Sequence, residues 1–384
     1  MPTGTLQQAN PATQTVSRRD QTSQPPDAYA SFIRESRKCN QLALAIAGNA
    51  FGAFISKTIK PSPGYLRGIW VIVKATGGSG GAATVAAQPD APWSAIQAFT
   101  LRDAFGSVVF QADGYGMYLI HLYSGQVGAA GLQDPTKDTW FSNVATGAGA
   151  SGNFQFALYV PLEFDPDTAY CALPSMNAAA QMTVNIQIAP SSAVYSTAPA
   201  TTLPSIEVDI EQEYWAVPIS DPSLTPPDDG SSHQWTQSIG QQNIASASNN
   251  RIQLPDVGTY LSSIICVFRD STNARIDTVI TTGDLELWVD GVPVRIEDFR
   301  VNTSRMFREF GITPRPTGVI VYTFRNSAGW IVNMDNMELL LPTTPGTLLE
   351  LFSGAWGTFG NSPATIQTYT GKLYPVGTVP EHNF

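Results

Sequence analysis

The feature that most constrains the fold is a series of short apolar or alternating segments, separated by clusters of Gly, Pro, Asn and Ser. Residues 65–74 are mostly apolar, which is typical of a strand covered on both faces. Residues 181–188 and 206–212 alternate between apolar and polar side chains, as half-buried strands do. Asp290-Gly291 is a strong signal for a two-residue hairpin. The pattern predicts an all-β chain, with no long helix after the amino-terminal arm.

A faint internal repeat accompanies the strands. Leu66 and Leu261 both follow Gly and Tyr and open apolar segments, 195 residues apart. Asp103 and Asp290 stand in similar surroundings, 187 residues apart. The chain has 384 residues, which is long for one β-domain. We therefore expect two β-sandwiches in tandem, with an arm and helix over 1–60, a first sandwich over 61–217, a linker over 218–233 and a second sandwich over 234–384.

The amino-terminal arm differs in charge from the rest of the chain. Residues 1–60 hold seven basic and three acidic residues, although the net charge of the whole chain is −10. An acidic body disfavours direct binding of nucleic acid, and a basic arm points to a separate partner. Between Asp27 and Gly48 the pattern predicts an amphipathic helix, whose polar face carries Arg34, Arg37 and Lys38. That face either is solvated or lies near anionic lipid. A membrane span over 39–56 is disfavoured by its polar residues.

Chemistry-bearing residues are scarce, with three His and three Cys. We predict no catalytic residue, metal or cofactor, and three free thiols that fit a reducing cytoplasm. His121 is expected to be packed, His233 to lie in the linker and Cys266 to be a buried thiol in an apolar strand. The glycines of residues 78–80 lack the helix that a dinucleotide-binding turn requires.

One strand carries acidic residues at alternate positions, which places all of them on one side. These residues, called here the acidic ladder, are Glu207, Asp209, Glu211 and Glu213. They form a solvated face, a subunit interface or, as a third alternative, a calcium site. The chain's basic cluster outside the arm could face such a ladder on a neighbouring subunit, and it comprises Arg295, Arg300, Arg305, Arg308 and Arg315.

Several segments together resemble the double jelly-roll major capsid proteins of tectivirus-type, membrane-containing tailless phages, in the lineage of the adenovirus hexon. These segments, in the family's order, are 66–74 (LRGIWVIVK), 159–164 (YVPLEF), 260–270 and 305–322. The resemblance implies two eight-stranded jelly rolls, homotrimeric pseudo-hexagonal capsomers and an icosahedral shell around an internal membrane. It also implies that the amino-terminal helix lies near that membrane.

The partners implied are other copies of the chain in a capsid lattice, penton or spike proteins and minor capsid proteins. The implied location is the virion shell, after assembly in the host cytoplasm. The alternative function is a jelly-roll protein that binds or cleaves polysaccharide, because eight Trp could stack on sugars. A receptor-binding fibre or spike is a third possibility. Paired glycosidase carboxylates need no local motif and stay open.

Overall fold

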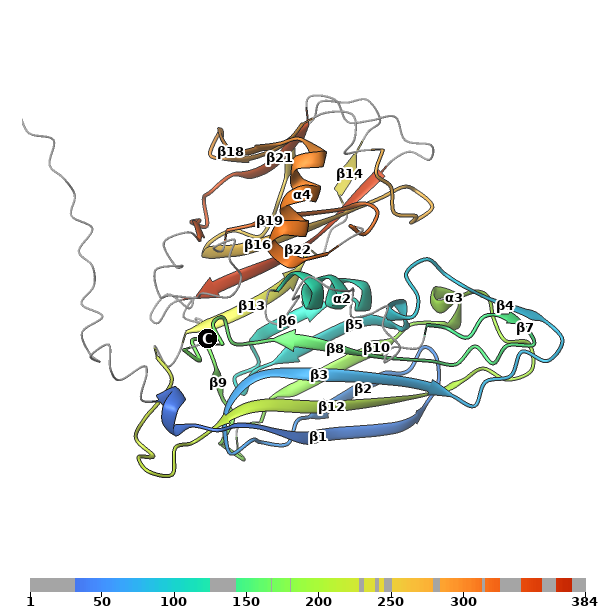
Figure 1. The fold of residues 1–384 in the computed structure, drawn as a ribbon, viewed down its shortest axis with the longest axis horizontal. Helices are drawn as coiled ribbons and strands as arrows, with labels where there is room; N and C mark the ends of the chain where they lie inside the picture. The colour runs from blue at the N-terminus through green and yellow to red at the C-terminus, as the bar shows by residue number, and fades with distance from the viewer. Residues whose placement is uncertain are drawn as a thin grey trace, which may run out of the picture.

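The first half of the chain folds into eight main strands in two facing sheets (Figure 1). The computed structural model describes residues 32–124, 143–166, 168–179, 181–227, 231–238, 242–244, 251–278, 284–312, 315–324, 340–353 and 364–374. One sheet has the order β1-β12-β3-β8, with bounds Lys38–Asn49, Ser205–Ala216, Gly64–Thr76 and Phe154–Pro161. The other has the order β6-β5-β10-β2, with bounds Val108–Ala112, Ile96–Arg102, Thr183–Ile188 and Phe54–Thr58.

The second half repeats this arrangement. One sheet has the order β13-β22-β16-β19, with bounds Ser232–Gln237, Ala364–Tyr374, Tyr260–Arg269 and Val319–Thr323. The facing sheet has the order β15-β21-β17-β18, with bounds Ile252–Gln253, Leu349–Ser353, Leu285–Val289 and Val292–Glu297. In both halves the first, eighth, third and sixth strands form one sheet, and the second, seventh, fourth and fifth form the other. This is the strand order of a jelly roll, so the predicted all-β fold of two tandem eight-stranded jelly rolls is confirmed.

Shorter elements decorate the two sandwiches. Two segments pair at strand ends, β9 (Leu173–Pro174) on β3 and β20 (Leu341–Pro342) on β16. β14 (Gln242–Ile244) extends the pairing of β22 beyond β13. A small three-stranded sheet and two short helical turns lie in the first half, and their bounds are β4 Thr84–Ala87, β7 Gly147–Ala148, β11 Tyr195–Thr197, η1 Trp93–Ala95 and α3 Ser191–Val194.

The alternating segments form strands with the predicted faces. In β10 the side chains of Val184 and Ile186 are fully buried, whereas those of Thr183 and Asn185 are half-buried. β3 lies inside its sheet, between β12 and β8, which explains its long apolar run. The predicted hairpin at Asp290-Gly291 connects β17 and β18, and both of its residues have positive φ, as a type I′ turn requires.

The predicted repeat corresponds to equivalent positions in the two sandwiches. Leu66 lies in β3 and Leu261 in β16, and both are third strands of their sandwich. In both strands the pairing with the eighth strand is irregular directly after this leucine. Asp103 and Asp290 each follow a fourth strand and begin the turn into the fifth. The faint similarity therefore marks the internal duplication of the jelly roll.

The predicted helix from Asp27 to Gly48 is wrong over most of its length. Of the described residues in this range, only 32–35 are helical, and Lys38–Asn49 form strand β1. β1 pairs with β12 along nearly its whole length, and Gly48, with φ of 78°, lies in an irregularity of the pairing between Ile46 and Asn49. The hydrogen bonds to β12 are a non-local gain that overrides local helix propensity. Leu42, Leu44 and Ile46 also recur at the period of a strand, a signal that the helical interpretation ignored.

In each sandwich the fifth strand is followed by one helix that the sequence did not predict. α2 (Gly114–Tyr123) follows β6, and α4 (Phe299–Phe310) follows β18. Each begins after an aspartate whose carboxylate accepts a backbone N–H, Asp113 from Gly116 and Asp298 from Arg300. α2 is buried along its whole length, so it lacks the amphipathic period by which helices are recognised.

The sandwiches begin earlier than the predicted boundaries. β1 and β2 pair with β12 and β10, so residues 38–58 belong to the sheets of the first sandwich and not to an arm. β13 starts at Ser232, inside the predicted linker of residues 218–233. The arm that precedes the first sandwich therefore ends before Lys38 and not at residue 60, and the linker ends before Ser232 and not at residue 233.

Thiol reactivity offers a simple check of the packing. Cys171 and Cys266 are buried, whereas Cys39 is half-buried on the edge strand β1. Burial raises the pKa of the Cys266 thiol to about 12, which leaves almost no reactive thiolate at pH 8. We expect a thiol reagent to modify Cys39 alone in the native protein and all three cysteines in denaturant. Peptide mapping by mass spectrometry would show this, and fast native labelling of Cys266 would contradict the packing described.

Candidate functional site

The structure does not gather the predicted basic residues on one helix face. Arg34 lies in the short helical turn of residues 32–35, whereas Arg37 and Lys38 lead into β1. All three side chains are exposed. The Lys38 ammonium stacks over the Trp215 ring, 5.0 Å from its centroid. The three cations thus lie just before and at the start of β1, and their role toward lipid stays a prediction.

The acidic ladder lies on one face of β12, as predicted, and other strands of the same chain compensate much of its charge. Lys74, on the neighbouring strand β3, places its Nζ 3.2 Å from Glu207 and 2.8 Å from Asp209. Trp70 Nε1 donates to Glu213 at 2.7 Å. Across β1, the Asn40 amide donates to Glu211. The ladder is a partly neutralised outer face of the first sandwich, and its role as an interface stays a prediction.

The predicted basic cluster is divided among local acidic partners. Two of its members, Arg300 and Arg308, keep strongly exposed side chains, 86% and 69% accessible. Arg295 and Arg305 both contact the buried Glu297. The remaining ion pairs are Arg300 with Asp298 at 2.9 Å, Arg308 with Glu309 at 3.5 Å and Arg315 with Asp277 at 2.7 Å. Arg300 and Arg308 are therefore the members best placed to meet another molecule.

The described histidines are packed rather than poised for catalysis. His121 is buried, and its Nδ1 accepts the backbone N–H of Tyr159 at 2.9 Å, as the packed interpretation expected. His233 does not lie in a linker, because it is buried in β13 against Phe164 and Trp235. Within the described part of the chain, no group of three His, Cys, Asp or Glu side chains could hold a metal ion. None of the described helices is both long and apolar enough to cross a membrane.

The most elaborate polar arrangement lies at the seam between the two sandwiches. β6 of the first sandwich pairs in parallel with β13 of the second, with Phe110 beside Trp235 (Figure 1). The pairing joins one sheet from each sandwich into a continuous ten-stranded sheet. One apolar cluster includes side chains of α2 together with Ile265 and Tyr369 of the second sandwich. The two jelly rolls therefore share a core along this seam.

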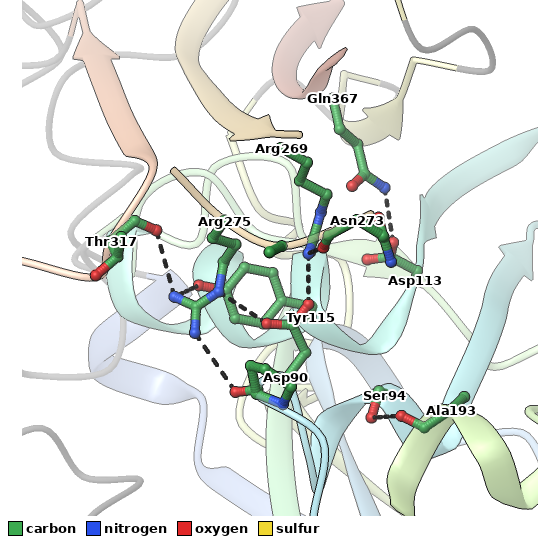
Figure 2. Close-up of polar contacts among 12 residues, drawn as sticks. Asp90, Ser94, Asp113, Tyr115, Ala193, Arg269, Asn273, Arg275, Thr317 and Gln367 are labelled. Atoms are coloured by element: carbon green, nitrogen blue, oxygen red, sulfur yellow. Dashed lines mark hydrogen bonds and ion pairs between the residues drawn. The ribbon is translucent and has the colours of Figure 1, made fainter. Parts of the chain in front are cut away.

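Asp113 connects the helix of the first sandwich to strands of the second. Its carboxylate accepts the backbone N–H of Gly116 at 2.7 Å, which caps α2. It also accepts a hydrogen bond from Gln367 Nε2 at 2.7 Å (Figure 2). The Tyr369 hydroxyl donates to the same carboxylate at 2.7 Å. The pKa of Tyr369 is raised well above its ordinary value, first by burial and then by the nearby Asp113 carboxylate. The Tyr369 hydroxyl therefore keeps its proton at neutral pH and donates it in the hydrogen bond to Asp113.

A second group of polar side chains joins the two sandwiches along the same seam. Arg269 and Arg275, from the second sandwich, contact Asp90 of the first at 2.6 and 2.8 Å. Figure 2 shows both guanidinium groups beside Tyr115, whose hydroxyl accepts from Arg275 Nη1 at 2.8 Å. The Arg269 side chain is almost fully buried. Both arginines also stack on the Tyr115 ring, so two cations share the Asp90 carboxylate and are held in fixed positions.

A cavity of about 320 Å³ opens at this seam, lined by residues such as Asp90, Asp113, Tyr115, Arg269 and Gln367. The charged groups on its wall already have partners, since Asp90 pairs with Arg269 and Asp113 accepts hydrogen bonds from Gln367 and Tyr369. The arrangement has no nucleophile with an adjacent base, and its geometry serves to hold two sandwiches together. Sequence analysis missed this seam, because each partner comes from a different element. The only local signal was the Asp before each unrecognised helix.

The fold and its fused seam define a class: the chain has the double jelly-roll fold of viral major capsid proteins, which confirms the family resemblance at the level of the fold. No family model matches the sequence, and no curated protein does.

Three solved structures illustrate the likeness. The crystal structure of the STIV MCP aligns with a TM-score of 0.60 and 15% identity, covering 89% of this chain and 98% of that one. The PBCV-1 virus capsid gives 0.58 and 14%, covering 88% and 93%. The major capsid protein P2 from bacteriophage PM2 gives 0.52 and 11%, covering 89% and 99%. At these identities the alignments establish a shared fold over nearly whole chains.

Proposed function

We propose that this protein is the major capsid protein of an icosahedral virus and has a structural, non-enzymatic role. The observation that carries the proposal is the fusion of two jelly rolls through a buried seam, in a chain that aligns almost end to end with viral capsid proteins. A shell protein needs rigid, precisely oriented sandwiches more than a reactive cleft. The paired charges of Asp90, Arg269 and Arg275 provide such rigidity.

In finer detail, three copies form a pseudo-hexagonal capsomer of six sandwiches, and capsomers pack into a lattice around an internal membrane. The virus is a tailless bacteriophage, and penton, spike and minor capsid proteins complete the shell, which assembles in the host cytoplasm. The exposed Arg34, Arg37 and Lys38 at the start of the first sandwich suit contact with anionic lipid headgroups.

The polysaccharide alternative has little support among the described tryptophans. Trp215 and Trp235 are buried, and Trp93 stacks face to face on Tyr118, with ring centroids 3.9 Å apart. Trp70 is half-buried and donates to Glu213. Rings used in this way for packing offer no open aromatic platform for a sugar.

The mass of the full-length protein in solution tests the capsomer. We expect light scattering to give three times the chain mass of 41.2 kDa, with hexagonal outlines in electron micrographs of the same peak. A monomer of 41.2 kDa at all protein concentrations tested would contradict the proposal.

A further inference from the structure

The cavity at the seam has walls from both sandwiches and is large enough for a small organic ligand. Its volume of about 320 Å³ lies at the lower end of the range for ligand sites. The first sandwich contributes residues next to η1, β5 and α3, and the second contributes Arg269, Asn273 and Gln367. Clefts between domains are a preferred place for ligands. The lining side chains therefore decide which ligand chemistry the cavity could accept.

Arg269 is a buried cation that uses only part of its hydrogen-bonding capacity. Its side chain is 5% exposed, and its Nη1 contacts the Asp90 carboxylate and donates to the Asn273 carbonyl at 3.0 Å. The N–H groups on its Nε and Nη2 find no acceptor in the part of the chain that the structure describes. Buried donors of this kind call for a bound water or ligand. Arg269 therefore offers these N–H groups to an oxygen atom in the cavity that it lines.

Gln367 provides a complementary acceptor beside Arg269 (Figure 2). Its side chain is buried, and its Nε2 donates to Asp113 at 2.7 Å, which fixes the orientation of the amide group. The Oε1 of the same amide receives no hydrogen bond from the described residues. Two exposed residues of the lining, Gln97 and Asn273, add side-chain amides that can both donate and accept. The cavity thus presents donors and acceptors together.

The charges around the cavity cancel, which favours a neutral ligand. Arg269 and Arg275 share the Asp90 carboxylate, and Asp113 supplies the second negative charge. Asp113 already accepts the hydrogen bonds of the helix cap and of the second sandwich, so it needs no further cation. A ligand with its own net charge would bring an unbalanced charge into a partly buried place, at a cost in free energy. Uncharged hydroxyl groups can use the same donors and acceptors without that cost.

One side of the cavity is apolar. It is formed by Ile96, Pro190 and Ala193 of the first sandwich, whose aliphatic carbons can pack against C–H groups of a ligand. A saturated ring with hydroxyl groups at its edge and C–H groups on its faces matches both the polar and the apolar walls. Because the ring contact is aliphatic, such a site does not depend on exposed tryptophans.

We propose that the cavity binds a neutral monosaccharide unit, with hydroxyl oxygens that accept from Arg269 and a hydroxyl group that donates to Gln367 Oε1. The amides of Gln97 and Asn273 bind further hydroxyl groups of the same ring. The unit is either a free sugar or the terminal residue of a glycan, since both present the same hydroxyl groups. All of the walls come from one chain, so binding does not require the capsomer.

Saturation-transfer NMR with the full-length protein tests the proposal. The probes are glucose, galactose, mannose and N-acetylglucosamine, together with a short glycan that ends in the sugar that binds best. We expect at least one of the four sugars to bind with a dissociation constant on the order of 1 mM, as a ligand of this size allows. Glucuronate and glucosamine carry a similar ring with a negative or a positive charge, and each should bind roughly tenfold more weakly.

Two substitutions in the lining locate the bound sugar. Gln97→Ala removes an exposed amide that makes no hydrogen bond with the described residues, so the fold should be kept while binding weakens about fivefold. Ala193→Phe places a ring at the apolar wall and should abolish binding. Gln253→Ala is the matched control, because Gln253 is an exposed strand glutamine outside the cavity and should leave binding unchanged. Near-UV circular dichroism reports the folding of each variant.

Two results would overturn the proposal. If none of the four sugars shows saturation transfer, water alone satisfies the donors of Arg269. If a sugar binds but neither Gln97→Ala nor Ala193→Phe weakens it, the site lies elsewhere. The glycan probe shows whether a terminal residue is bound as well as the free sugar. Since the capsomer is tested by its mass, the capsid function stands or falls independently of these results.

Discussion

Replacing Asp113 by alanine is expected to lower the free energy of unfolding by about 3–5 kcal/mol, one of the two largest effects predicted for a single substitution in this chain. The variant loses the cap of α2 and leaves the buried Tyr369 hydroxyl and the Gln367 amide without their acceptor. These donors belong to the second sandwich, so the damage falls on the coupling between the sandwiches. We expect thermal unfolding to change from one transition to two, measured by calorimetry at fixed chain concentration.

The same substitution in the second sandwich is the matched control. Asp298 caps α4 at the position equivalent to Asp113, but its carboxylate is held by the exposed Arg300 and has no partner across the seam. Asp298→Ala should therefore leave a single transition and a much smaller loss of stability. Equal effects of the two variants would show that Asp113 acts only as a helix cap.

Local patterns predicted these strands well. A strand with one buried face alternates between apolar and polar residues, and a strand with two buried faces is apolar along its length. The alternation in β10 and the apolar run in β3 follow directly from their positions in the sandwich. The turn at Asp290-Gly291 was also readable, since positive φ at both residues favours this pair. Even the faint repeat was informative, because equivalent turns and strand starts keep similar residues.

Elements that depend on distant partners were predicted poorly. β1 is an edge strand whose hydrogen bonds come from β12, more than 150 residues later. Its local pattern fits both a helix and a strand, so only this distant pairing decides between them. α2 is surrounded by both sandwiches and has no polar face to reveal its period. The acidic ladder was located correctly, but Lys74 on β3 could not be assigned to it before the register was known. The missing information in each case is the pairing of strands far apart in sequence.

A buried ion pair in the first sandwich could not be predicted for the same reason. Glu163, just after β8, has no exposed surface and forms an ion pair with Arg67 of β3. Trp215 Nε1 donates to the same carboxylate at 3.0 Å, and the Arg67 guanidinium lies 4.9 Å from the centre of the Trp215 ring. Burial raises the pKa of Glu163, and the charge of Arg67 opposes this rise. Arg67 thus favours the ionised form of this buried carboxyl group.

Arg67→Ala is expected to destabilise the protein by about 3–5 kcal/mol, because it leaves the Glu163 carboxylate buried and unneutralised. The pKa of Glu163 should then rise further above its value in the unfolded chain, so Glu163 takes up a proton more readily in the native variant. The stability deficit should shrink as pH falls through this raised pKa and return as pH rises. Urea unfolding of wild type and variant between pH 4 and 8, at a fixed chain concentration, measures both effects.

Two comparisons make this result specific to the buried pair. Lys74→Ala removes another cation from the same strand, but its side chain is 39% exposed. Of its two partners, Glu207 is exposed and only Asp209 is buried, so we expect a smaller loss, of about 1 kcal/mol. The double variant Arg67→Met with Glu163→Gln carries no buried charge and should recover much of the stability lost by Arg67→Ala. If Arg67→Ala cost no more than Lys74→Ala at neutral pH, Glu163 would have to be protonated in the native wild type. The ion pair would then contribute packing and hydrogen bonds but no charge, and the expected pH dependence would disappear with it.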